Sequence, residues 1–179
     1  MHPTARLSEE HVSILLGLDV LERIAERLGE DPAAVASDAR LIVDFIRGFA
    51  DELHHLKEEG MLFVAMEAAG HSRHAGPIGV MLAEHEEGRA LVRSMIGALE
   101  DPQSGADTFE AAALSFAQLL RSHIMKEDHI LFPMAEQTLS EATRADLVRR
   151  FGEHDEVVHG VAYRGHLDAL ARLAERYPG

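Results

Sequence analysis

Two stretches of the sequence repeat a pattern of histidine and glutamate that is suited to binding a metal ion. The first, HHLKEEGMLF, runs from His54 to Phe63, and the second, HIMKEDHILF, runs from His123 to Phe132. Each copy holds a His and a Glu four residues apart. On a helix this spacing puts both side chains on one face about one turn apart, so both can reach the same metal centre.

The second copy lies on an apolar helix face. His123 and Glu127 fall on the same steps of three and four residues as Phe116, Leu120 and Ile130, which is the spacing of residues in a bundle core. Burial of an unpaired carboxylate costs several kcal/mol, and a bound cation offsets that cost. A metal ion would account for an acid at this position.

The first copy offers two pairs at the same spacing, His54 with Glu58 and His55 with Glu59. His54 shares its side of the helix with apolar residues, whereas the residues on the side of His55 are small or charged. Since an amphipathic helix turns its apolar side inward, we expect His54 and Glu58 to face the interior.

Two more histidines, His11 and His85, fall within apolar stripes of other expected helices, which would bring four His and two Glu into the interior. Six ligands fill one octahedral ion, or they serve two ions if the carboxylates bridge and small ligands complete the shells. The chain has no Cys, which excludes disulfides, iron–sulfur clusters and thiolate sites. His and carboxylate ligands favour iron, manganese or zinc.

The segments that carry these residues have helical patterns. Apolar residues recur at helical spacing from Glu9 to about Leu28, and Ser8 is the expected N-cap. A second helix is predicted to open at Pro32 and to run to about residue 69. It would be unusually long for a small domain, so we expect a bend or break near Gly60.

Two further helices are predicted after the loop at 70–77. The third has an apolar face between Ile78 and Leu99, and the fourth has one between Phe109 and Met134, after a turn at 101–105. A more polar helical segment over about 140–176 is expected to pack outside a four-helix core. The whole of 1–179 is predicted to form a single all-α domain with its bundle core at about 7–138.

The charge and hydropathy of the chain restrict its partners. A formal net charge of −14 repels phosphate backbones and anionic membrane surfaces, which argues against nucleic acid and lipid headgroups as partners. No apolar run approaches the ~20 residues that a membrane helix needs, and the first residues lack an apolar signal core. We therefore expect a cytoplasmic protein.

The order of the motifs, His, then His-x-x-x-Glu, then His, then His-x-x-x-Glu, resembles the hemerythrin-like (HHE cation-binding) family. The strings GPIGVMLAEHEEGR, from Gly76, and HIMKEDHILFP, ending at Pro133, support the resemblance, which spans about Leu7 to Met134. It implies an antiparallel up-down four-helix bundle around two iron ions bridged by oxide or hydroxide. It places Glu58 and Glu127 as bridging ligands, within the full ligand set His11, His54, Glu58, His85, His123 and Glu127.

The sequence departs from the oxygen-carrying hemerythrins at two positions. Those proteins carry two His four residues apart on the third helix, where this chain has Met81 and Arg89 on either side of His85. They also end the fourth-helix motif with an Asp five residues after its His, which is Asp128 here, while Glu127 has the four-residue spacing. One iron is then a His short, and its open position would admit peroxide, nitric oxide or an extra ligand from the set His55, His154, His159 and Tyr163.

The function expected from this resemblance is that of a di-iron protein that reacts with small oxidants or diatomic ligands, foremost hydrogen peroxide in a catalase-like reaction. The alternative is a non-catalytic module that senses or stores oxygen, nitric oxide or iron. Zinc or manganese could occupy the same ligands, and a metal-free polar network could also account for the buried histidines. A ferritin-like site would use Glu-x-x-His pairs, such as Glu52 with His55 and Glu156 with His159.

Overall fold

The computed structural model describes residues 2–157 and 160–178, without the side chains of 157 and 160–163. All the regular structure in these residues is helical, which confirms the predicted all-α class. No helix among the described residues is both long enough and apolar enough to cross a membrane.

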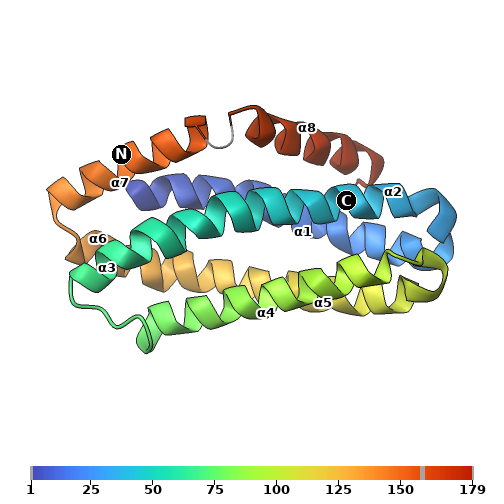
Figure 1. The fold of residues 1–179 in the computed structure, drawn as a ribbon, viewed down its shortest axis with the longest axis horizontal. Helices are drawn as coiled ribbons and strands as arrows, with labels where there is room; N and C mark the ends of the chain where they lie inside the picture. Colours follow the sequence, from blue (N-terminus) through green and yellow to red (C-terminus); the bar gives the residue numbers. More distant parts are fainter. Residues whose placement is uncertain (1, 158–159, 179) are drawn as a thin grey trace.

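Four long helical segments lie side by side, and consecutive segments run in opposite directions (Figure 1). The first is α1 (Pro3–Glu30), and the third is α4 (Gly76–Ala98). The second, at 32–68, consists of α2 (Pro32–Phe45), the π-helical η1 (Ile46–His55) and η2 (Glu58–Leu62), and α3 (Phe63–Ala68). The fourth, at 102–138, consists of α5 (Pro102–Lys126), the π-helical η3 (Glu127–Leu131) and α6 (Phe132–Thr138). We call α1 with 32–68 the first hairpin, and α4 with 102–138 the second.

Several of the helices begin at a proline, as α1 and α2 do at Pro3 and Pro32. Pro32 begins α2 as predicted, and the side chain of Asp31 caps it by accepting a hydrogen bond from the backbone N–H of Ala34 at 3.2 Å. The predicted N-cap at Ser8 is wrong, because α1 already begins at Pro3. Ser8 instead donates its hydroxyl hydrogen to Asp128 at 2.7 Å.

The break expected near Gly60 takes the form of a π-helical turn and not the end of a helix. A second π-helical turn, η3, begins at Glu127, so each Glu of the two repeats opens such a turn. A π-turn accommodates an extra residue within a continuous helix, and such turns are frequent at functional sites.

The apolar core consists of two clusters with a polar layer between them. The larger cluster joins the central and C-terminal parts of α1 to α2, α4, α5 and α8. The smaller cluster lies around Phe63, Phe132 and Phe151. The layer between them is composed of buried charged and polar side chains, including His11, His54, Glu58, His85, His123 and Glu127.

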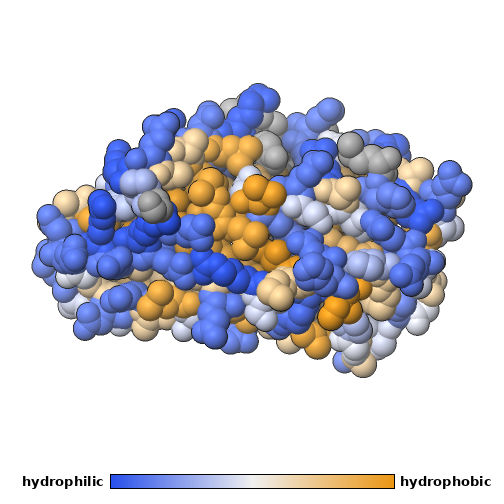
Figure 2. Space-filling view, turned by 180° about the vertical axis from the view of Figure 1, so that it is seen from behind, coloured by the Kyte–Doolittle hydropathy of each residue, from blue (hydrophilic) through white to orange (hydrophobic). Residues whose placement is uncertain are grey.

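The C-terminal segment forms two helices, α7 (Glu141–Val157) and α8 (Gly160–Arg176). Both lie on the outside of the first hairpin (Figure 1), and they contribute Leu147, Phe151, Leu170 and Leu173 to the two clusters. The predicted segment at 140–176 is thus helical and peripheral. The face seen from behind is mainly hydrophilic toward its ends and more apolar near its middle (Figure 2).

Candidate metal centre

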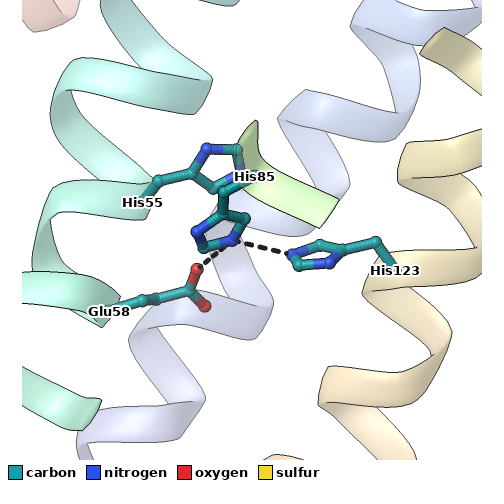
Figure 3. Close-up of side chains that lie close together, drawn as sticks. All are labelled: His55, Glu58, His85 and His123. Carbon is teal, nitrogen blue, oxygen red and sulfur yellow. Dashed lines mark hydrogen bonds and ion pairs between the residues drawn. The ribbon is translucent and has the colours of Figure 1, made fainter. Parts of the chain in front are cut away.

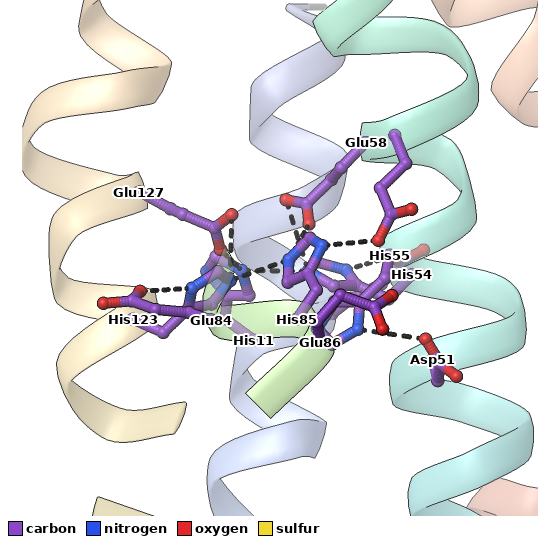
Figure 4. A network of polar contacts seen from close by, with 12 residues as sticks. His11, Asp51, His54, His55, Glu58, Glu84, His85, Glu86, His123 and Glu127 are labelled. Carbon is purple, nitrogen blue, oxygen red and sulfur yellow. Dashed lines mark hydrogen bonds and ion pairs between the residues drawn. The ribbon is translucent and has the colours of Figure 1, made fainter. Parts of the chain in front are cut away.

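All six residues that the sequence singled out lie together in the polar layer, at most 2% exposed. His11 comes from α1, His54 and Glu58 from the second long segment, His85 from α4, and His123 with Glu127 from the fourth. Their side chains point toward one another across the interior (Figure 4). Ligand atoms of His11, His54, Glu58 and Glu127 lie within 4.8 Å of one another, and so do those of His55, Glu58, His85 and His123.

The two carboxylates connect the histidine pairs of the two hairpins. The oxygens of Glu127 lie 3.2 Å from Nε2 of His11 and 3.2 Å from Nε2 of His123. Those of Glu58 lie 3.5 Å from Nε2 of His54 and 3.5 Å from Nε2 of His85. Each carboxylate therefore directs one oxygen toward the histidines of the first hairpin and the other toward those of the second. This arrangement suits a pair of ions with two bridging carboxylates.

The other ring nitrogen of each histidine is hydrogen-bonded to an acid. The Nδ1 atom of His54 donates to Glu10 at 2.8 Å, and that of His123 donates to Glu84 at 2.9 Å. The remaining two bonds run from His85 to Glu59 at 2.7 Å and from His11 to Asp128 at 3.1 Å. Such bonds fix the tautomer and leave the Nε2 lone pair free to bind a metal.

The inner atoms of the layer are arranged as a cation would require. With Nδ1 as donor, the Nε2 lone pairs of His11 and His54 face each other at 3.1 Å, and those of His85 and His123 do so at 3.0 Å. All four oxygens of Glu58 and Glu127 are buried without a hydrogen-bond partner. Facing lone pairs and orphaned carboxylate oxygens are unfavourable unless a positive charge lies between them. The residues present therefore fit a metal pair.

Without metal, protons supply part of that positive charge. Burial lowers the pKa of His85, but the adjacent carboxylates of Glu58 and Glu59 outweigh it and raise the pKa to about 9. The pKa values of His11 and His123 are also raised, because interactions with Glu127 outweigh their burial. His54 is the exception, since burial lowers its pKa to about 3.

The metal-free protein is expected to lose stability between pH 6.5 and pH 9. A pKa of about 9 in the folded protein, against 6.5 as the ordinary value, means that protonated His85 contributes stability below pH 6.5, and that this contribution is lost as the pH rises through 9. Urea unfolding of metal-free protein across this window measures the effect. The metal-loaded protein should lack this fall, because coordinated histidines do not bind the proton. Stability that rises with pH in the metal-free protein would contradict the prediction.

His55 is buried, contrary to the expectation that it faces away from the apolar side. It is 5% exposed and stacks on His85 with ring centroids 3.9 Å apart (Figure 3). The reason is that η1 is π-helical, and a π-helix turns less per residue than an α-helix, so two adjacent histidines both reach the interior. Glu52, its partner in the ferritin-like alternative, is exposed.

Among the other suggested extra ligands, the structure describes the side chain of His154 alone, and it does not join the layer. His154 lies on α7, with its Nδ1 atom 3.7 Å from Asp155, and it belongs to neither group of candidate metal ligands. His159 lies outside the described residues, as does the side chain of Tyr163.

Four acids that hold the histidines, Glu10, Glu59, Glu84 and Asp128, were not predicted to do so from the sequence. Neither Glu10 nor Glu84 was among the predicted site residues. A signal was present in the sequence outside the two repeats, because Glu10 precedes His11 just as Glu84 precedes His85. Glu59 and Asp128 likewise follow the two inner glutamates. The two hairpins are thus related by an approximate twofold symmetry that includes these supporting acids.

Comparisons with known proteins agree with this geometry. Residues 2–135 match the family model of the hemerythrin HHE cation-binding domain. The iron-sulfur cluster repair protein YtfE of Musicola paradisiaca is 30% identical over 140 residues, which is 73% of this chain and 61% of that protein. The YtfE protein of Enterobacter sp. is 28% identical, covering 75% and 63% of the two chains.

An uncharacterized protein of Mycobacterium bovis, Mb2018, is 24% identical over 172 residues, which cover 93% of this chain and 67% of that protein. The chain spans about three fifths of the length of the YtfE proteins that it matches. No solved structure matches it.

Proposed function

Because the chain belongs to the hemerythrin HHE cation-binding domain family, we propose that its polar layer binds two iron ions. His11 and His54 would hold one ion, and His85 and His123 the other, with Glu58 and Glu127 bridging both. The observation that carries the proposal is the set of four buried carboxylate oxygens without a hydrogen-bond partner, facing four imidazole nitrogens.

The proposed activity is reaction with small oxidants, foremost hydrogen peroxide. A bound iron pair supplies a redox centre and a Lewis acid. The chain contributes a layer that is closed to bulk water on two sides by the apolar clusters, with Nε2 of each histidine oriented by an acid on Nδ1. Four histidines and two carboxylates do not fill the shells of two six-coordinate ions, so small molecules can bind.

Metal content and peroxide turnover test this proposal together. Iron-loaded protein is expected to contain about two irons per chain and to evolve oxygen from hydrogen peroxide in proportion to its iron. His123→Ala should lose both the second iron and the oxygen evolution. A matched control is His129→Ala, which removes an exposed histidine from the neighbouring π-turn. Two bound irons without oxygen evolution would refute the catalase-like activity, and no bound iron would refute the site.

A second candidate function is handling of iron itself, which the name of the YtfE relatives favours. In that case the layer would store or donate iron, and the metal would leave readily. The same loaded sample distinguishes the two functions, because a store releases iron to a weak chelator without peroxide turnover. An enzyme retains its iron through many turnovers.

A further inference from the structure

The approximate symmetry of the two hairpins is broken next to the metal layer. Beside the second-hairpin histidines, three polar residues form a connected group. Nδ1 of His55 is bonded to Asp51 at 3.3 Å, and the guanidinium of Arg89 donates to the same carboxylate at 2.7 Å. The residues at the symmetry-related positions are Ile124, Leu120 and Leu15.

A cavity of about 260 Å³ lies on this polar side of the layer. Its inner end is formed by His55 and His85, two members of the second group of candidate metal ligands. Most of its wall surface is apolar and comes from η1, α4 and α5, with Ala50, Val92 and Phe116 among the lining residues, and charged side chains including Arg47, Glu52 and Arg93 line the rest.

One glycine helps to keep the cavity open. Gly88 lines it, and a Cβ atom at this position would lie 3.4 Å from the ring of Phe116. The symmetry-related residue in the first hairpin is Ile14, which is 2% exposed and belongs to the core. The branched side chain of Ile14 thus fills this position in the first hairpin. In the second hairpin Gly88 has no side chain, and the space that remains reaches the metal layer.

The cavity is much larger than hydrogen peroxide needs. A water molecule takes about 30 Å³ of liquid volume, so the cavity has room for an organic molecule of roughly ten non-hydrogen atoms. Its apolar walls suit a hydrocarbon body, and the histidines at its inner end suit a polar head group. Because Nδ1 of His55 is bonded to Asp51, its Nε2 is left to face that head group.

We propose that this cavity binds an organic hydroperoxide, with its apolar body between η1 and α4 and its peroxide group against His55 and the metal layer. The inference rests on the proposed function, for which it names the substrate class. In the net reaction the O–O bond would break, the hydroperoxide would accept two electrons and two protons, and the products would be the alcohol and water. A bound metal pair would supply the electrons, and two molecules of a small thiol, oxidised to one disulfide, would return them and release two protons.

Binding can be tested without metal and without turnover. We expect 2-phenyl-2-propanol, the alcohol that corresponds to cumene hydroperoxide, to bind metal-free protein at one saturable site, as measured by calorimetry. Gly88→Ile introduces the side chain that the first hairpin carries at the related position, Ile14. It should weaken binding of the alcohol by about tenfold or more, because it fills part of the pocket. The matched control is Gly97→Ile on the same helix, where a Cβ atom would have no neighbour within 4 Å. Gly88→Ala repeats the test with a smaller change if the Ile variant fails to fold.

Reaction with cumene hydroperoxide completes the test. Reduced, iron-loaded protein should convert it to the alcohol, and Gly88→Ile should slow this reaction by a similar factor of about ten or more. The proposal is overturned if the alcohol does not bind saturably, or if Gly88→Ile and Gly97→Ile bind it equally well. A third outcome is that the alcohol binds and that Gly88→Ile weakens its binding, but that the iron-loaded protein reacts with no peroxide. This result would overturn both the proposed activity and the assignment of a hydroperoxide as substrate. The cavity would then be a site for an apolar alcohol.

Discussion

Lys57→Met is expected to lower the free energy of unfolding by about 3 to 5 kcal/mol, because removing one partner leaves buried charges uncompensated. Lys57 is fully buried, and its ammonium group contacts the carboxylates of Glu10 and, at 3.1 Å, Asp155. Arg6 contacts Asp155 from its other side. The substitution would leave Glu10 with only its bond to His54, and Asp155 with one fewer cation.

Urea unfolding of the metal-free variant measures this effect, and the repeat supplies a matched control. Lys126 occupies the equivalent position in the second copy and contacts Glu84, but it is 32% exposed. Lys126→Met should therefore cost no more than about 1 kcal/mol. Equal losses in the two variants would show that the burial of Lys57 under α7 has no energetic consequence.

The same substitution should also weaken metal binding at the first-hairpin histidines. Glu10 orients His54 through Nδ1, and Lys57 holds Glu10 in place. Loss of an outer partner of a ligand typically lowers metal affinity by about 10- to 100-fold. This chain of contacts gives the C-terminal segment a role, since Asp155 of α7 lies at its outer end.

The double substitution Glu58→Gln with Glu127→Gln is expected to abolish binding of the ion pair. An amide keeps the shape of the side chain but removes the charge and the second coordinating oxygen, so no bridge can form. Metal content should fall from about two irons per chain to below about one, while circular dichroism still reports a helical protein. Two irons bound to the double variant would exclude bridging by these residues.

The matched control for the double variant is Glu59→Gln with Asp128→Asn. These acids follow the inner glutamates directly and bond to Nδ1 of His85 and His11. The control should still bind two ions, with affinity lower by about 10- to 100-fold. The inner double variant should also lose the fall in metal-free stability between pH 6.5 and 9, because Glu58 and Glu127 help to raise the pKa of His85.

The sequence predicted that the two His-x-x-x-Glu pairs lie in the interior, and the structure buries both. The prediction was possible because such a pair on an apolar stripe is costly to bury unless a cation binds between its members. The placement of His54 and Glu58 required only α-helical spacing. His55 was misplaced because that spacing does not hold in η1, and nothing in single-sequence periodicity marks a π-turn before the structure is known. The repeat itself contained the clue, since His55 stands where the second copy has Ile124.

The outer acids and the buried lysine were harder to predict for a different reason. Charged residues such as Glu10, Glu84 and Lys57 are usually solvated, and composition alone gives no ground to bury them. Their burial follows from tertiary packing, with α7 covering Lys57 and the opposite helix of each hairpin presenting the Glu. Such pairings become visible only once the two repeats are superimposed as hairpins.

The polar layer also determines how the molecule can open. It separates two apolar clusters, and side chains in one cluster gain little from packing in the other. We therefore expect the end of the metal-free protein around Phe63, Phe132 and Phe151 to act as a cooperative unit that can unfold while the larger cluster stays folded. Ions bound in the layer between the clusters would join these two units, so that metal binding would make unfolding more cooperative.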